Sequence, residues 1–140
     1  MGIGALISDE AAMSESSENG KPRYDLEERT AKFGQRAIVF AKSIPFSAVN
    51  KPLIDQFVRS ATSVGANYCE ADDAETKPDF RHKIGICRKE ARETKYWLRM
   101  IATSEPELAE QARVLWREAK ELHLIFAAIF CGRKRQQKPG

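Results

Sequence analysis

Basic residues recur on one side of a helical segment in the second half of the chain, at a spacing that suits the binding of phosphate groups. They are Arg81, Arg88, Arg92, Lys95 and Arg99, and the next segment repeats the pattern with Arg113, Arg117 and Lys120. At about 100° per residue, each group falls within an arc of about 60°, and no acidic residue interrupts the first. Such a ridge can hold the phosphates of RNA or DNA without reading the bases. A solvent-exposed charged face is the alternative interpretation.

The spacings that metal and nucleophilic chemistry require are missing from the sequence. A carboxylate-bridged metal centre in a helical bundle uses Glu-x-x-His pairs, and neither His82 nor His123 follows a glutamate at that distance. There is no Cys-x-x-Cys motif. Cys69, Cys87 and Cys131 fall in or beside apolar stripes, so we expect buried structural thiols. Glycine-rich phosphate loops and the nucleophile elbow are absent as well. We therefore predict a protein with no catalytic residues, no metal and no cofactor, that is, a non-enzyme.

Four segments of the chain carry apolar residues at alternating steps of four and three, the period of a helix with one buried face. They run over residues 26–44, 50–74, 79–101 and 108–129. Asp25 and Glu28 form a capping-box-like start for the first segment, and Pro45 ends it. No segment alternates with a period of two, and helices joined by short connections run antiparallel. The sequence thus predicts an all-α fold, namely an antiparallel up-down four-helix bundle.

Length and composition fit a single soluble domain with a charged tail at each end. The chain has 140 residues, of which 42% are hydrophobic and 31% charged. We expect a disordered tail over residues 1–22, the bundle over 23–132 and a basic tail over 133–140. The net charge of +3 conceals an acidic segment over residues 1–20 (−4) and the basic tail (+4). Because no apolar run reaches the ~20 residues of a membrane span and the N-terminus is a poor signal peptide, we expect a cytoplasmic protein.

Apolar residues also occur outside the predicted core stripes, which favours self-association. On the first segment these residues are Ile38 and Val39. On the third segment Ile86 and Trp97 lie about 90–110° from the core line, beside Glu93. Second apolar flanks on several helices are typical of a homo-oligomer, and the alternative for each residue is the edge of a wide core.

The second segment carries a polar stripe opposite its apolar face. The stripe consists of Gln56, Arg59, Ser63, Ala66, Asn67 and Glu70. A solvated face is one interpretation, and a polar contact between helices or between subunits is the other, since arginine and carboxylate side chains pair readily in such contacts.

Two parts of the sequence resemble the signatures of a known family. Residues 56–70 read QFVRSATSVGANYCE, which is similar to a second-helix pattern of Gln, Arg-Ser-Ala, Ser, Ala-Asn and Glu. Phe80 followed by RKEARETKYWL at residues 88–98 is similar to the third-helix signature. The family is the bacterial four-helix-bundle family encoded within intervening sequences of 23S ribosomal RNA genes. The resemblance extends over residues 25–130, nearly the whole predicted bundle.

The resemblance implies a small cytoplasmic bundle that assembles as a ring-like homopentamer. A related branch of the family acts as an accessory subunit of a retroelement reverse transcriptase and binds nucleic acid through a basic surface of the pentamer. The residues that match the family pattern are implied to do structural or subunit-interface work, and they form a second candidate set together with Ile86. The matching residues are Arg59, Ser63, Asn67, Glu70, Glu93, Thr94 and Trp97.

Two hypotheses about function follow. In the first, the protein is a non-enzymatic oligomeric bundle that binds RNA or DNA phosphates nonspecifically through its basic ridges. In the second, it is a structural or protein-interaction adaptor, for example an accessory of a reverse transcriptase or a ribosomal component, whose charge serves solubility alone. Replacing Arg88, Arg92 and Arg99 by glutamate separates them, because only the first hypothesis predicts a large loss of binding.

Overall fold

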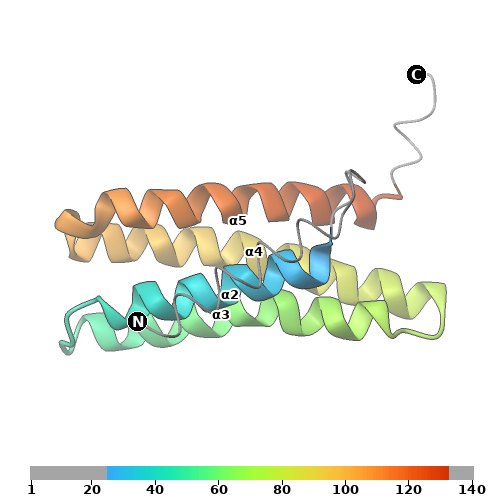
Figure 1. The fold of residues 1–140 in the computed structure, drawn as a ribbon, viewed down its shortest axis with the longest axis horizontal. Coiled ribbons are helices and arrows are strands. Elements are labelled where there is room, and N and C mark those ends of the chain that lie inside the picture. The colour runs from blue at the N-terminus through green and yellow to red at the C-terminus, as the bar shows by residue number, and fades with distance from the viewer. Residues whose placement is uncertain (1–24, 133–140) are drawn as a thin grey trace, which may run out of the picture.

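Four α-helices account for nearly all of residues 25–132, the part of the chain that the computed structural model describes (Figure 1). They are α2 (Leu26–Lys42), α3 (Asn50–Asp72), α4 (Lys77–Ser104) and α5 (Ala109–Phe130), and a single 3₁₀ turn, η1 (Pro106–Leu108), precedes α5. There is no strand within residues 25–132, so the prediction of an all-α fold with four helices is confirmed. The tails expected over residues 1–22 and 133–140 lie outside the described residues.

Side-chain caps explain where two of the helices begin. The Asp25 carboxylate accepts a hydrogen bond from the Glu28 N–H at 3.1 Å, so the predicted start of α2 is confirmed. Helix α4 begins at Lys77, earlier than the predicted start near Asp79. The Thr76 hydroxyl accepts a hydrogen bond from the Asp79 N–H at 3.1 Å, and Pro78 occupies the first turn, where its missing N–H costs nothing.

The helices pack as neighbours in chain order. Helix α4 lies between α3 and α5 and packs closely against both, whereas α2 packs mainly against α3 and has a smaller contact with α5 (Figure 1). None of the helices within residues 25–132 is both long and apolar enough to cross a membrane. Because α4 has two close neighbours, its side chains line two separate interhelical grooves.

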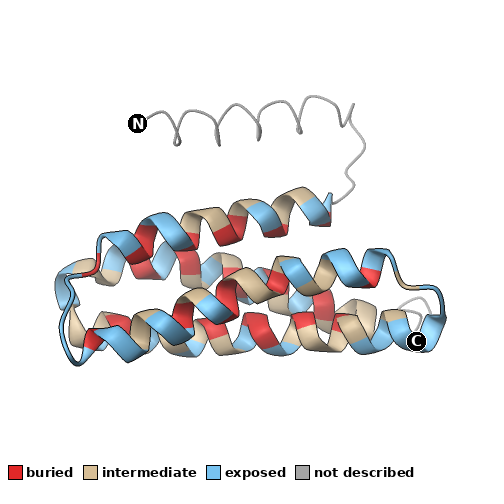
Figure 2. Ribbon diagram, turned by 90° about the horizontal axis from the view of Figure 1, so that it is seen from below, coloured by how far each residue is buried: buried red, intermediate tan, exposed pale blue. Residues whose placement is uncertain are grey.

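The core is formed by the inward sides of all four helices. Buried residues follow these inner sides in Figure 2, and the largest fully buried side chains include Phe33, Phe57, Phe126 and Leu98. The rings of Phe40 and Phe57 meet edge to face at 5.9 Å between centroids, which adds a directional contact to the apolar burial. Helices α2 and α3 approach closely at Gly65, where an added Cβ would lie 3.1 Å from the Thr30 hydroxyl oxygen.

A buried asparagine connects three parts of the chain at one end of the molecule. Asn50, which is 1% exposed, donates from its amide nitrogen to the Pro45 carbonyl and to the Glu105 carboxylate, both at 2.8 Å. Its amide oxygen accepts a hydrogen bond from the Ser104 hydroxyl at 2.6 Å. The start of α3, the preceding loop and the end of α4 are therefore held together by one fully bonded side chain.

Candidate nucleic-acid interface

Helix α4 carries more positive charge than any other of the four helices. It has eight Lys or Arg residues against three acidic residues, whereas α2 has four against two, α3 has two against three and α5 has three against three. The basic surface predicted from the sequence therefore depends first on α4, and then on how the mixed charges of α5 are oriented.

Packing divides the charges of α5 between its two neighbours. Arg29 of α2 binds Glu118 through Nε at 2.8 Å and Glu121 through Nη2 at 2.8 Å, so two acidic residues of α5 lie beside α2. The hydrogen bond and charge of Glu118 raise the pKa of Arg29 above its ordinary value. The predicted basic group of α5 lies on the other side, next to α4. Two of the three acidic residues of α5 are therefore held beside α2, whereas its basic residues lie on the α4 side. The third acidic residue, Glu110, lies about 20° from Arg117 around the helix.

Residues of α4 and α5 meet at heptad intervals along this groove. Arg81 lies opposite Phe130, the Arg88 carbonyl is 3.3 Å from His123, and Lys95 lies opposite Trp116. Each step of seven residues forward along α4 is matched by a step of seven back along α5. Seven residues of helix span about 10.5 Å, so cationic and aromatic residues face each other at regular spacing over about 20 Å.

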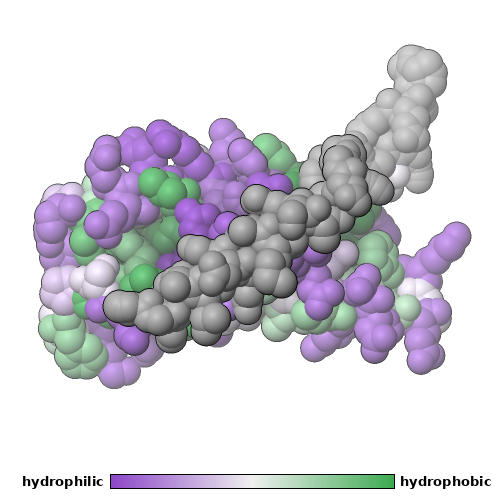
Figure 3. Space-filling view, in the orientation of Figure 1, coloured by the Kyte–Doolittle hydropathy of each residue, from purple (hydrophilic) through white to green (hydrophobic). Residues whose placement is uncertain are grey.

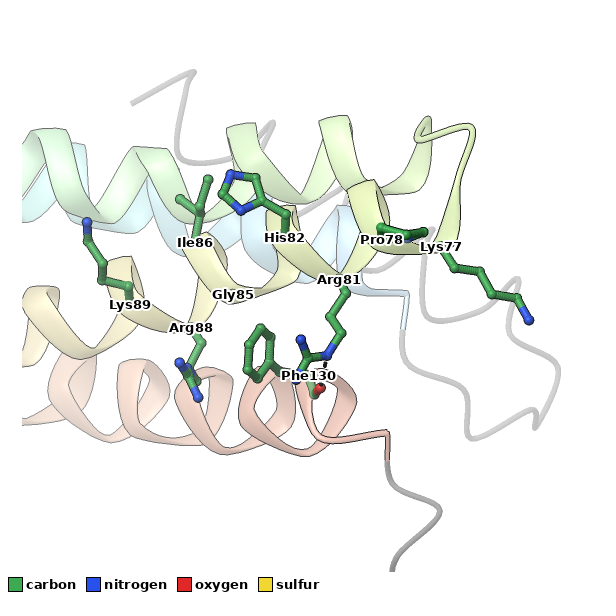
Figure 4. A pocket seen from close by; sticks show the side chains of 9 residues that line it. All are labelled: Lys77, Pro78, Arg81, His82, Gly85, Ile86, Arg88, Lys89 and Phe130. Atoms are coloured by element: carbon green, nitrogen blue, oxygen red, sulfur yellow. Dashed lines mark hydrogen bonds between the residues drawn. The ribbon is translucent and has the colours of Figure 1, made fainter.

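At one end of the groove two arginines enclose a phenylalanine ring, and we call Arg81, Gly85, Arg88 and Phe130 the Phe130 cluster. The guanidinium carbons of Arg81 and Arg88 lie 4.0 and 4.4 Å from the centroid of the Phe130 ring (Figure 4). Arg81 also donates from Nε to the Phe130 carbonyl at 3.0 Å, which gives a hydrogen-bond partner to one of the last carbonyl groups of α5. Helical side chains lean toward the N-terminus, which is why Arg88 reaches back to this ring.

Further along the groove lies a second group, the Trp116 cluster. It comprises Lys95, Arg99, Arg113, Trp116, Arg117 and Lys120. The ammonium nitrogens of Lys95 and Lys120 lie 5.3 and 5.7 Å from the Trp116 ring centroid, within reach of cation–π attraction. Arg99, Arg113 and Arg117 join Trp116 in lining a hollow of about 460 Å³. The two clusters together hold seven of the eight predicted cations.

The eighth cation, Arg92, lies between the clusters near His123. Burial holds the pKa of His123 below its ordinary value, and the positive charges of Lys95, Arg88 and Arg92 lower it further, whereas the bond to the Arg88 carbonyl acts in the opposite direction. His123 is therefore neutral at pH 7 and donates from Nδ1 to that carbonyl. Its contribution to the groove at neutral pH is a hydrogen bond and an aromatic surface, not a charge.

None of the eight predicted cations makes an ion pair with a carboxylate of residues 25–132. The six ion pairs of this region involve other cations, on α2, α3 and the α3-facing side of α4: Arg29, Lys51, Arg59 and Lys83. We call the eight unpaired cations along the α4–α5 groove the basic face. The structure places them on one side of the molecule, and most of their charge is not neutralised by described acidic residues.

The second candidate set lies in the other groove of α4, against α3. Arg59 of α3 binds the Glu90 carboxylate at 3.4 Å and the Glu93 carboxylate at 3.0 Å. Beneath this pair the buried Thr94 hydroxyl donates either to Ser60 Oγ at 3.0 Å or to the Glu90 carbonyl at 2.8 Å. Of the polar stripe predicted on the second helix, Arg59 and Glu70 thus contact α4 of the same chain.

The remaining members of the second set lie further along the same groove or beside it. Glu70 pairs with Lys83 at 2.6 Å, and Asn67 donates to the Ser63 carbonyl of its own helix at 2.9 Å. Trp97 and Ile86 are both partly buried, and Trp97 packs against the core of its own chain. By contrast, Ile38 and Val39 remain 43% and 54% exposed, and the face in Figure 3 shows small apolar patches among hydrophilic residues.

The prediction of three buried thiols is wrong for two of the cysteines. Cys87 is fully buried and its thiol lies 3.5 Å from the Val64 carbonyl, whereas Cys69 and Cys131 are exposed. Cys69 lies one helical position, about 100°, beyond Tyr68 at the edge of the core stripe, and Cys131 follows the last residue of α5. Within the described residues no group of three or more His, Cys, Asp or Glu side chains is arranged to hold a metal ion.

Sequence reasoning did not identify Phe130 or Gly85 as part of the candidate interface. Phe130 comes directly after the fourth apolar segment, which the sequence predicted over residues 108–129. The available signal was the heptad series Trp116, His123 and Phe130, which mirrors Arg81, Arg88 and Lys95. The register of α4 against α5 decides that these two series meet.

The fold and the charge distribution define the class of protein: a four-helix, all-α protein with a basic face along one interhelical groove. The chain belongs to the 23S rRNA-intervening sequence protein family, whose model matches residues 24–127. The family assignment inferred from the two signatures is therefore confirmed.

A solved relative supports this assignment. The crystal structure at 1.70 Å resolution of a protein of unknown function from the S23 ribosomal protein family of Bacteroides thetaiotaomicron VPI-5482 is 30% identical, with a TM-score of 0.65. The match covers 74% of this chain and 96% of that chain. No curated protein matches the chain.

Proposed function

We propose that the protein is a non-enzymatic member of its family whose basic face binds the phosphates of RNA or DNA without reading base sequence. The observation that carries this proposal is the gathering of eight cations along the α4–α5 groove with no carboxylate of residues 25–132 paired to them. An arginine that is already paired with a carboxylate has its charge neutralised within the protein. An unpaired arginine can instead bind a phosphate and replace one of the counterions of the nucleic acid.

The test is nucleic-acid binding measured by fluorescence anisotropy across a range of salt concentrations, with charge reversals on two surfaces. The basic-face variant, called variant one, changes Arg88, Arg92 and Arg99 to glutamate. The control changes Lys32, Arg36 and Lys42 to glutamate on α2, which does not pack against α4, and alters the net charge by the same amount. Circular dichroism of both variants verifies that the helices are retained.

Each cation that contacts one duplex phosphate contributes about 0.9 to the slope of log K against log salt, so variant one should lower that slope by about 2.7. The α2 control should keep the wild-type slope and lose only the modest affinity that a change of net charge brings. Salt-independent binding, no binding to either nucleic acid, or equal losses in both variants would refute the proposal.

We further propose that the chain forms an antiparallel up-down bundle that assembles in the cytoplasm as a ring-like homo-oligomer, with five subunits implied by the family resemblance. The reversed register of α4 against α5 supports the up-down arrangement. The α4 flank around Ile86, Glu93 and Trp97 is the proposed contact. Changing Ile86 to aspartate should lower the mass measured by light scattering, while changing the exposed Val114 to aspartate on α5 should not. A monomeric wild type would contradict this proposal.

The adaptor hypothesis has one observation in its favour. Phe46 and Val49, in the connection between α2 and α3, are exposed apolar residues and could form a protein contact, to a reverse transcriptase or a ribosomal component for example. In that case the glutamate variant of Arg88, Arg92 and Arg99 would keep its partner, and changing Phe46 and Val49 to serine would remove it.

A further inference from the structure

We propose that the Phe130 cluster is a discrete binding site for one phosphate group. The inference rests on the proposed function for the source of that phosphate, a nucleic-acid backbone, but the site itself is defined by local chemistry. Free inorganic phosphate offers the same oxygens, so the experiment below uses both.

The first argument is the supply of hydrogen-bond donors. A guanidinium has five N–H groups, and among contacts with residues 25–132 only the Nε of Arg81 is engaged, with the Phe130 carbonyl. The terminal nitrogens of Arg81 and all the guanidinium nitrogens of Arg88 donate no hydrogen bond to residues 25–132. Each guanidinium therefore keeps unused planar donors, the kind of group with which arginine binds a phosphate in a bidentate manner.

The second argument is that the Phe130 ring fixes the arginines in place. Figure 4 shows both side chains extending from α4 toward α5 with the ring between them. Long arginine side chains lose substantial conformational freedom when they bind a ligand, and a ring that already holds them reduces this cost. The arrangement requires a glycine at position 85, because an added Cβ would lie 2.8 Å from Cε1 of the Phe130 ring.

The third argument is the charge of the surroundings. The cluster lines a cleft of about 750 Å³ whose other lining residues include Lys77, His82 and Lys89, with no carboxylate among them. The acidic residues at this end of the molecule line a different hollow, between α3 and the start of α4, where Lys83 pairs with Glu70.

The experiment uses variants that alter the cluster without altering its charge. Gly85→Ala displaces the ring, Phe130→Leu removes it, and Phe46→Leu is the matched control at an exposed phenylalanine outside the cluster. Binding of inorganic phosphate is followed through the ¹⁵Nε signals of Arg81 and Arg88. Binding of a single-stranded and a duplex oligonucleotide is followed by anisotropy, with the full chain in every case.

If the site exists, phosphate moves both arginine signals in the wild type and in Phe46→Leu. Gly85→Ala and Phe130→Leu should each lose about tenfold in phosphate affinity, roughly the effect of one charge-assisted hydrogen bond. An equal loss for the oligonucleotides identifies the backbone phosphate as the ligand, and a loss confined to inorganic phosphate identifies the free anion.

The site and the proposed function fail separately. If phosphate moves neither signal, or if both cluster variants bind phosphate and oligonucleotides as the wild type does, the site is overturned even where nucleic acid still binds to the basic face. If no oligonucleotide binds but phosphate shifts both signals and Gly85→Ala abolishes the shift, the site stands and the proposed function fails.

Discussion

Replacing Arg59 by alanine should destabilise the folded chain itself, because its guanidinium is the cation that faces the Glu90 carboxylate. The Glu90 side chain is only 10% exposed, whereas that of Arg59 is 48% exposed, and Arg59 also binds Glu93. Breaking a fully buried ion pair costs about 3–5 kcal/mol, and an exposed pair contributes about 0–1 kcal/mol. With one partner buried, the other half-exposed and the distance a long 3.4 Å, we expect a loss of about 1.5–2 kcal/mol in the free energy of unfolding.

Urea unfolding followed by circular dichroism measures this loss. With a slope of about 1–2 kcal/mol per molar urea, the midpoint should fall by about 0.8–2 M. Lys51→Ala is the control, since the Lys51–Asp55 pair is exposed on both sides and its removal should cost less than about 0.5 kcal/mol. A double-mutant cycle with Glu90→Gln should recover a coupling of about 1 kcal/mol.

Protein concentration distinguishes a contact within the chain from a contact between subunits. If Arg59 acts within one chain, the difference between variant and wild type is the same at low and high micromolar protein. A difference that grows as the protein is diluted would mean that Arg59 acts across a subunit interface. An unchanged midpoint at every concentration would refute the reasoning altogether.

Three further predictions concern the buried Asn50 amide, the lowered pKa of His123 and the reactivity of the thiols. Asn50→Ala removes hydrogen bonds to Pro45, Ser104 and Glu105 and should lower the free energy of unfolding by about 2–3 kcal/mol. The control is Asn67→Ala, because the Asn67 amide bonds to its own helix, and it should lower the free energy by less than about 1 kcal/mol. Equal losses of the two variants in urea unfolding would contradict this prediction. Since the folded pKa of His123 is below its ordinary value of about 6.5, the unfolded chain binds more protons between the two values, and the free energy of unfolding should fall as the pH falls through that window. Compared with His123→Gln, the wild type should lose more stability between about pH 7.5 and 5.5, and parallel pH profiles would count against the depressed pKa. Burial raises the pKa of Cys87 to about 12, so a chromogenic thiol reagent should label Cys87 only on unfolding. The exposed Cys69 and Cys131 should be labelled quickly in the folded protein. Labelling of all three thiols at one rate would disprove the burial of Cys87.

The sequence determined the helices because helix formation depends on near neighbours along the chain. Apolar residues at steps of three and four define the inner sides, and the Asp25 cap defines the start of α2. Pro45 predicted an end at residue 44, and α2 ends two residues earlier, at Lys42. The arcs of basic residues on α4 and α5 follow from the same local periodicity. The two signature segments were likewise readable as residues in order, which is why the family could be recognised without coordinates.

Tertiary structure decided which side chains meet, because this depends on the rotation and register of each helix against its neighbours. The pairing of Glu118 and Glu121 with Arg29, which holds two of the three acidic residues of α5 beside α2, has no signal within either helix. From the sequence, Arg59 was compatible with water, another helix or another subunit, and packing places Glu90 beside it. The enclosure of Phe130 by Arg81 and Arg88 needs a specific offset between α4 and α5 and a glycine at the point of contact, and only the folded chain supplies both.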